Sequence, residues 1–140
     1  MKYEREIVSD PAYIKDLRNH RCVFTLQYAP MCESVVPMHV GNPGKGLKTD
    51  NEAMPILNRF HVHGHQHGEV SMFRHQAPEH VIRDACAAYE RYAGKTFDAT
   101  GDALVRLWRT TMGDFLIREA MRAFAREYYA EWRKKQESGR

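Results

Sequence analysis

The stretch from residue 60 to residue 69 reads Phe60-His61-Val62-His63-Gly64-His65-Gln66-His67-Gly68-Glu69 and holds four of the chain's eight histidines. In a helix, residues four apart are neighbours, so His61 and His65 would share one face and His63 and His67 another. Gly64 costs a helix about 1 kcal/mol relative to alanine, but we predict a short helix over 58–69. In a strand, all four rings would point to one side. The protein would then be a simple divalent-metal binder, which is an alternative interpretation.

Two imidazoles four residues apart on a helix are a common way to bind one divalent metal ion. We therefore predict a metal site on His61 and His65, with His63 and His67 on a solvated face. A histidine-rich surface segment without function is the alternative at this point.

A strand and a glycine-rich loop precede the histidine segment, over residues 34–40 and 41–51. Valines favour the strand, whereas three glycines and a proline oppose regular structure in the loop. His39 lies at the end of the strand, so a strand–loop–helix hairpin would return it to the side of the predicted metal site. There it could be a ligand or a general base on water. Lys45 and Lys48 of the loop could hold a phosphodiester backbone.

Helical patterns dominate the rest of the chain. The other predicted elements are a helix from Pro11 to residue 19 or 20, a strand over 22–28, a small apolar anchor over 54–57, a helix from 77 to Gly94, and helical structure over 102–135 with a break or kink at Gly113.

The C-terminal helical region carries an apolar stripe and, beside it, a row of arginines. The stripe consists of Ile117, Met121, Phe124, Tyr128 and Trp132. Its aromatic side chains, with Trp108 and Phe115 nearby, are many for a small unit to bury, so we predict a homodimer through these helices. The row of Arg118, Arg122 and Arg126 would either track a DNA backbone or form a solvated face with neighbouring glutamates.

Composition limits the class of protein. With 140 residues, 43% of them hydrophobic, the chain fits one compact domain, or a small domain with an appended helix, and is not wholly disordered. It has no apolar run of the ~20 residues that a membrane span needs. The first residues lack the apolar region of a signal peptide, so we expect a cytoplasmic protein. Three cysteines are an odd number in a chain without an export signal, which argues against a disulfide framework, and no two of them form the C-x-x-C pair of a four-cysteine zinc site. A net charge of +3 does not by itself indicate nucleic-acid binding.

A series of short motifs occurs in a characteristic order. They are Cys22, then Val36-Pro37-Met38-His39-Val40-Gly41, then Gly44-Lys45-Gly46-Leu47-Lys48-Thr49-Asp50, then Pro55-Ile56-Leu57, then His61-x-x-x-His65-x-x-Gly68-Glu69, and Phe73. This order resembles the phage-associated HNH endonucleases over roughly residues 12–95, whereas residues 96–140 lie outside the resemblance.

The resemblance implies an α+β fold with a small ββα-metal core, in which two strands, a loop and a helix surround one divalent ion. An N-terminal helix and C-terminal helices would flank this core. The domain organisation would be an HNH-like unit over 1–95 and a helical extension over 96–140.

The resemblance also implies residue roles. His39 would be the general base that activates water, and His61 and His65 would bind a divalent ion (Mg, Mn, Ni or Zn). Asn51, or its neighbour Asp50, would hold the loop and orient His39. The substrate would be DNA.

Two departures from the family pattern matter. Members often hold a structural zinc with paired cysteines, but here the partners of Cys22 are replaced by Thr25, Leu57 and Phe60, so we expect no structural zinc. The residue before the base is Met38, a poor ligand for a hard ion. Either His63, His67 or Glu69 completes the metal shell, or catalysis is lost. The alternative function is therefore a catalytically inactive HNH-fold protein that binds DNA or a protein partner, as a phage accessory or inhibitor.

Overall fold

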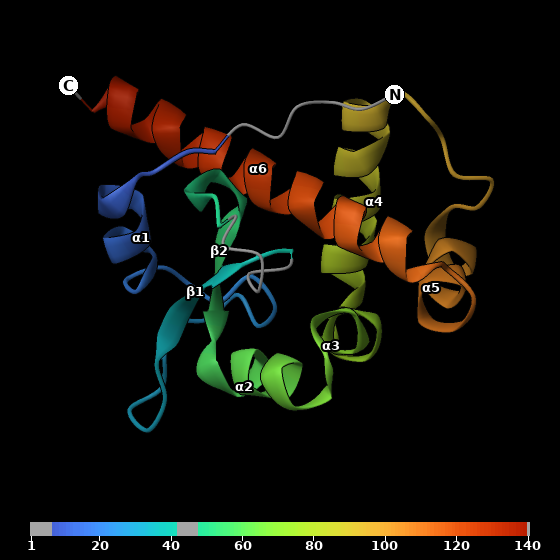
Figure 1. The fold of residues 1–140 in the computed structure, drawn as a ribbon, viewed down its shortest axis with the longest axis horizontal. Helices are drawn as coiled ribbons and strands as arrows, with labels where there is room; N and C mark the ends of the chain where they lie inside the picture. Colours follow the sequence, from blue (N-terminus) through green and yellow to red (C-terminus); the bar gives the residue numbers. More distant parts are fainter. Residues whose placement is uncertain (1–6, 42–47, 140) are drawn as a thin grey trace.

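The structure, a computed structural model, describes residues 7–41 and 48–139 and is built of helices around one two-stranded sheet (Figure 1). Its elements are α1 (Pro11–Leu17), β1 (Val35–His39), the 3₁₀ turn η2 (Asp50–Glu52), β2 (Ala53–Leu57), α2 (Asn58–His67), α3 (Glu69–Gln76), α4 (Glu79–Ala93), α5 (Gly101–Thr110) and α6 (Asp114–Ser138). The predicted α+β class is confirmed. In the described part of the chain, no helix combines the length and the apolar content that crossing a membrane requires.

The sheet is a single antiparallel pair in which β1 faces β2, with Val35 opposite Leu57 and His39 opposite Ala53. Pro37 lies directly opposite Pro55. This pairing is tolerated because the polar groups of Pro55 point away from β1, where its carbonyl accepts a hydrogen bond from the Val23 amide at 3.0 Å. The predicted apolar anchor over 54–57 is thus the buried strand β2.

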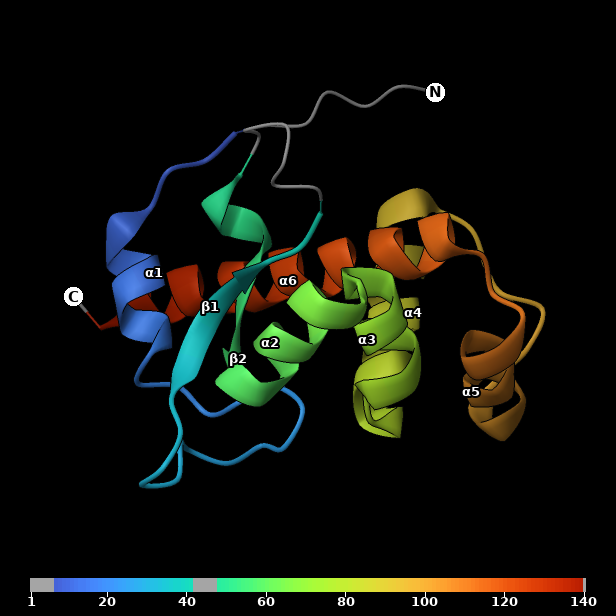
Figure 2. The ribbon, with the colours of Figure 1, turned by 60° about the horizontal axis from the view of Figure 1, so that its bottom comes forward.

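The histidine segment is helical, so the alternative of a strand with four aligned histidines is wrong. Helix α2 follows β2 without a loop and ends at Gly68, whose φ of 96° lies in the region that favours glycine. Gly64 is buried in α2, where its backbone approaches Met72 of α3. Helices α2 and α3 therefore pack closely beside the sheet (Figure 2).

The predicted strand over 22–28 is wrong, because this segment folds back on itself. The Cys22 amide donates to the Gln27 carbonyl at 2.9 Å, and Leu26, with φ of 60°, donates to the Cys22 carbonyl at 2.8 Å. The buried Cys22 sulfur accepts hydrogen bonds from the amides of Phe24 and Leu57. A sulfur that organises a turn and caps β2 therefore overrides the β-propensity of the segment.

Helix α6 crosses the molecule and packs most extensively against α4, with α1 beside its C-terminal half (Figure 1). The predicted break at Gly113 is confirmed, since α5 ends at Thr110 and α6 begins at Asp114. Most of the aromatic side chains that suggested a dimer are packed within the chain: Trp108 is fully buried, and Trp132 contacts Tyr13 with ring centroids 5.0 Å apart. Of the four aromatic residues that suggested a dimer (Trp108, Phe115, Phe124 and Trp132), only Phe115 is largely exposed, at 66%.

One hydrophobic core joins the two predicted parts of the chain. It contains Met54 and Ile56 of β2 together with Trp108 of α5 and Ile117 and Met121 of α6. The residues on either side of position 95 therefore share a core, and α6 forms one wall of the fold rather than a separate layer.

The arginine row of α6 does not form a solvated face. Arg126 binds the carboxylate of Glu52, which has no exposed surface, through Nε at 2.8 Å and a second nitrogen at 2.7 Å. Arg122 pairs with the buried Glu119 at 2.9 Å. Two of the three arginines thus neutralise buried carboxylates.

Replacing Arg126 with alanine is expected to destabilise the fold strongly. The substitution leaves the buried carboxylate of Glu52 without its counterion, and breaking a buried ion pair typically costs 3–5 kcal/mol, so we expect a loss of about 4 kcal/mol. Urea unfolding followed by circular dichroism measures this. Arg133→Ala, which removes an exposed arginine from the same helix, should cost about 0.5 kcal/mol or less. If the two substitutions lowered the free energy of unfolding equally, the stabilising role of the Glu52–Arg126 ion pair would be contradicted.

Replacing Gly64 with alanine is expected to stabilise the fold. The new methyl group would meet its nearest neighbours at 3.8 Å, an ordinary contact. Because glycine is a poor helix residue, the free energy of unfolding should rise by about 0.5–1 kcal/mol. Gly68→Ala is the matched control and should lower the free energy of unfolding, since its backbone has φ of +96°. A loss of stability in Gly64→Ala would contradict this prediction and show that α2 and α3 pack too closely at position 64 to admit a methyl group.

Candidate active site

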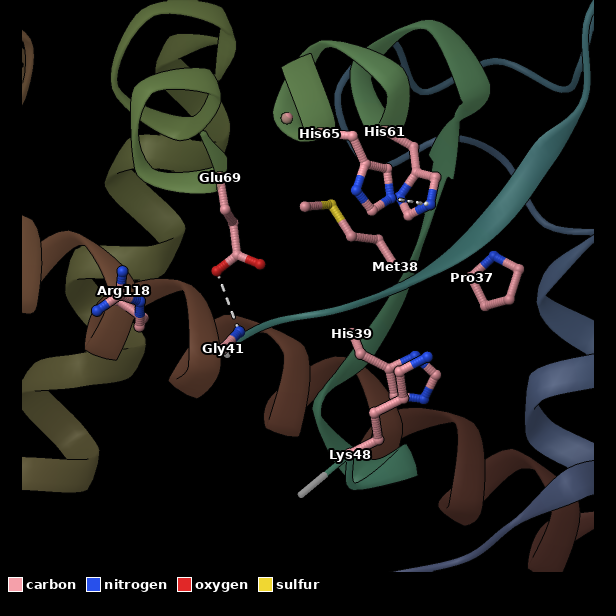
Figure 3. A pocket seen from close by; sticks show the side chains of 10 residues that line it. Pro37, Met38, His39, Gly41, Lys48, His61, His65, Glu69 and Arg118 are labelled. Carbon is pink, nitrogen blue, oxygen red and sulfur yellow. Dashed lines mark hydrogen bonds between the residues drawn. The ribbon is translucent and has the colours of Figure 1, made fainter. Parts of the chain in front are cut away.

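A cavity of about 560 Å³ opens where β1, α2, α3 and α6 meet. The side chains that line it include three of the predicted site histidines, His39, His61 and His65, and two cations, Lys48 and Arg118. In Figure 3 they come from separate elements, with His61 and His65 on one side of β1, His39 and Lys48 on the other, and Arg118 at a distance from both groups. The hairpin of β1 and β2 therefore brings the strand-end histidine back to the helix, as the sequence predicts.

His61 and His65 form a tight pair on one face of α2. Their Nε2 atoms lie 3.1 Å apart, and their rings meet edge to face. With metal–nitrogen bonds of about 2.0–2.1 Å, two imidazoles that bind one ion also place their nitrogens about 3 Å apart. The other ring nitrogen of His61, Nδ1, is buried and has no hydrogen-bond partner in the described part of the chain. The Nε2 separation therefore matches that of two ligands of one ion, but the partner that a ligating imidazole usually has at its other nitrogen is not among the described residues.

Burial lowers the pKa of His61, and the nearby charges of His65, Lys48 and His39 lower it further. The lowered pKa keeps the ring neutral at neutral pH, which is the form that binds metal.

His39 is held by Asp50. Its Nε2 atom lies 2.9 Å from the Asp50 carboxylate, and both side chains are half-buried. The second carboxylate oxygen of Asp50 accepts the Asp10 amide at 2.7 Å, so the carboxylate is fixed from two sides. Because a carboxylate only accepts hydrogen bonds, Nε2 is the donor, and Nδ1 keeps a free lone pair in the neutral ring. This arrangement suits a general base.

Asn51 contacts Thr49 rather than His39. Its Oδ1 accepts a hydrogen bond from the Thr49 hydroxyl at 2.6 Å, and the Thr49 oxygen accepts the Val8 amide at 2.8 Å. Asn51 therefore helps to fix the backbone before β2, whereas Asp50 makes the contact that orients His39.

Glu69 and Arg118 lie toward the end of the cavity away from the histidine pair. In Figure 3, Met38 lies between the histidine pair and Glu69. Glu69 accepts the Gly41 amide at 3.0 Å. Burial raises the pKa of Glu69, although the Gly41 hydrogen bond and the charges of Arg118 and Arg122 oppose this shift. Arg118 was not predicted as a site residue; its place in the arginine row was the only signal.

A third protein ligand for the metal is not evident. Within residues 7–41 and 48–139, no three His, Cys, Asp or Glu side chains are grouped so that they could hold one ion. His63 and His67 pair with each other on another face of α2, with ring centroids 4.6 Å apart. Of the two predicted phosphate contacts, Lys48 lines the cavity and Lys45 lies outside the described residues.

Comparison of the chain with models of known protein families, with curated proteins and with solved structures finds no match. The chemistry of the cavity is therefore argued from its own side chains. Three imidazoles, two cations and one carboxylate line the cavity, a composition that favours an anionic ligand.

Removing the positive charge of Lys48 is expected to raise the pKa of His61. Lys48 is one of the charges that lower this pKa, although burial is the larger cause, so the Lys48→Ala variant should keep part of the shift. The titration of the His61 Hε1 resonance in metal-free protein measures it. Because a protonated imidazole does not bind metal, the same variant should also lose metal at a higher pH than the wild type. Arg106→Ala, which removes the charge of an exposed side chain of α5, should change neither property. A His61 titration midpoint that does not move in Lys48→Ala would contradict the effect assigned to Lys48.

Proposed function

We propose that the protein is a divalent-metal-dependent endonuclease of HNH type that hydrolyses phosphodiester bonds in DNA. One observation carries the proposal: His39, oriented by Asp50, and the His61/His65 pair line one cavity together with Lys48 and Arg118. General base, metal ligands and phosphate-attracting cations are the groups that this reaction needs.

His61 and His65 would hold the metal ion through their Nε2 atoms, and Met38 would contribute no ligand. When bound, the ion would supply positive charge that stabilises the negative charge developing on the phosphate.

His39 would take the proton from the attacking water at Nδ1. Asp50 keeps Nε2 as the donor and stabilises the imidazolium that forms, so the ring holds its orientation through the step. Lys48 would attract the phosphodiester backbone into the cavity.

The second candidate is a catalytically inactive HNH-fold protein that binds DNA or a protein partner. Two observations favour it. Met38 lines the cavity, where its thioether is a poor ligand for a hard ion, and in the described part of the chain the histidine pair has no third metal-binding group.

A plasmid-nicking assay with Mg²⁺, Mn²⁺, Ni²⁺ and Zn²⁺ tests the proposal. The wild type should nick DNA with at least one of these ions, and His39→Ala should lower the rate by about 10²–10⁴-fold, the usual contribution of a general base. His61→Ala and His65→Ala should each abolish the nicking that the metal ion supports.

The matched control is the His63→Ala/His67→Ala double variant. It removes the same residue types from another face of the same helix and should nick like the wild type. Absence of nicking with every ion, combined with tight DNA or protein binding, would favour the inactive alternative.

A further inference from the structure

We propose that Arg118 of α6 binds a phosphate that flanks the scissile one, so that the C-terminal helix forms part of the substrate site. This inference rests on the proposed function. It assigns a role to a region that the family pattern does not cover.

Arg118 differs from the other arginines of its row in having no hydrogen-bond or ion-pair partner among the described residues. Arg126 and Arg122 bind buried carboxylates, whereas within residues 7–41 and 48–139 the Arg118 guanidinium makes no hydrogen bond or ion pair. The Arg118 charge lowers the pKa of Glu69, but the Glu69 carboxylate accepts its hydrogen bond from the Gly41 amide. The guanidinium therefore lines the cavity with its donors available.

The position of Arg118 relative to the histidines determines which phosphate it reaches. The charge of Arg118 lowers the pKa of Glu69, so these two side chains are neighbours. Together with the view in Figure 3, this places Arg118 at the end of the cavity away from the histidine pair. A phosphate beside the histidines is thus not the one that Arg118 contacts.

The chemistry of the side chain suits a phosphodiester. A guanidinium presents a planar fork of N–H donors that can bind two phosphate oxygens at once, and it stays charged at any relevant pH. A cavity of about 560 Å³ has the size of ordinary ligand sites. Under the proposed function its ligand is an oligonucleotide strand, with the scissile phosphate beside the histidines and a neighbouring phosphate at Arg118.

Two substrates distinguish a flanking contact from a contact with the scissile phosphate. Bis(p-nitrophenyl) phosphate has one phosphodiester, whereas an oligonucleotide duplex or a plasmid has many. Arg118→Ala should raise KM for DNA about tenfold and leave hydrolysis of the small diester within twofold of the wild type. His39→Ala should lose both activities. A loss of both activities in Arg118→Ala, or of neither, would overturn the proposal.

A binding measurement without metal separates this inference from the proposed function. Fluorescence anisotropy of a labelled duplex in EDTA should show weaker binding by Arg118→Ala, with the slope of log K against log salt reduced by about one. Arg118→Lys should keep the salt slope and lose part of the affinity. Arg106→Ala, which removes an exposed charge elsewhere, should bind like the wild type.

The outcomes of the two measurements are distinct. Weaker metal-free binding by Arg118→Ala with no hydrolysis by the wild type would refute the proposed enzyme and keep Arg118 as a phosphate contact. Hydrolysis by the wild type with unchanged binding by Arg118→Ala would refute the role of Arg118 alone. Thermal unfolding of each variant checks that the fold is intact, and the melting temperature of Arg118→Ala should change little because among the described residues its guanidinium makes no hydrogen bond or ion pair.

Discussion

The ion pair between Glu52 and Arg126 holds together the parts of the molecule that matter for the site. A carboxylate with no exposed surface is tolerated only when a counterion and hydrogen bonds neutralise it, so α6 cannot leave η2 without a large cost. The same turn closes the sheet, because the Glu52 carbonyl accepts the Val40 amide at 2.9 Å. Two residues earlier, Asp50 holds His39. One buried pair thus fixes the end of the sheet and the orientation of the candidate base.

The orientation of α2 decides which of its histidine pairs faces the cavity. Because Leu57 ends β2 and Asn58 begins α2, the register of the sheet fixes the rotation of the helix. The helix has no capping side chain of its own, but the Asn58 amide donates to the Ser34 carbonyl and the Arg59 amide donates to the Glu33 carboxylate at 2.9 Å. Groups from the turn before β1 therefore take the place of a local cap, where a negative charge also suits the helix dipole.

The sequence was sufficient where local signals determine the structure. Asp10 caps α1, Gly94 ends α4 in a left-handed conformation, and the spacing of His61 and His65 predicted their pairing. It was insufficient where distant groups decide. The segment after Cys22 is rich in β-forming residues, but a sulfur that caps β2 makes it a turn. The choice of Asp50 over its neighbour depends on how η2 is rotated, and that rotation is set by contacts with α6 that no local pattern contains.

The arginine row explains how the C-terminal helix α6 contributes a side chain to the cavity. Residues four apart lie on nearly the same face of a helix, so fixing two of them fixes the direction of a third. Arg126 and Arg122 are fixed by the buried carboxylates of Glu52 and Glu119. The row then carries Arg118 to the cavity, where Arg118 has no carboxylate partner among the described residues. The two paired arginines therefore act as a framework for the third, and a spacing that resembles a solvated face in the sequence becomes one wall of the cavity in the fold.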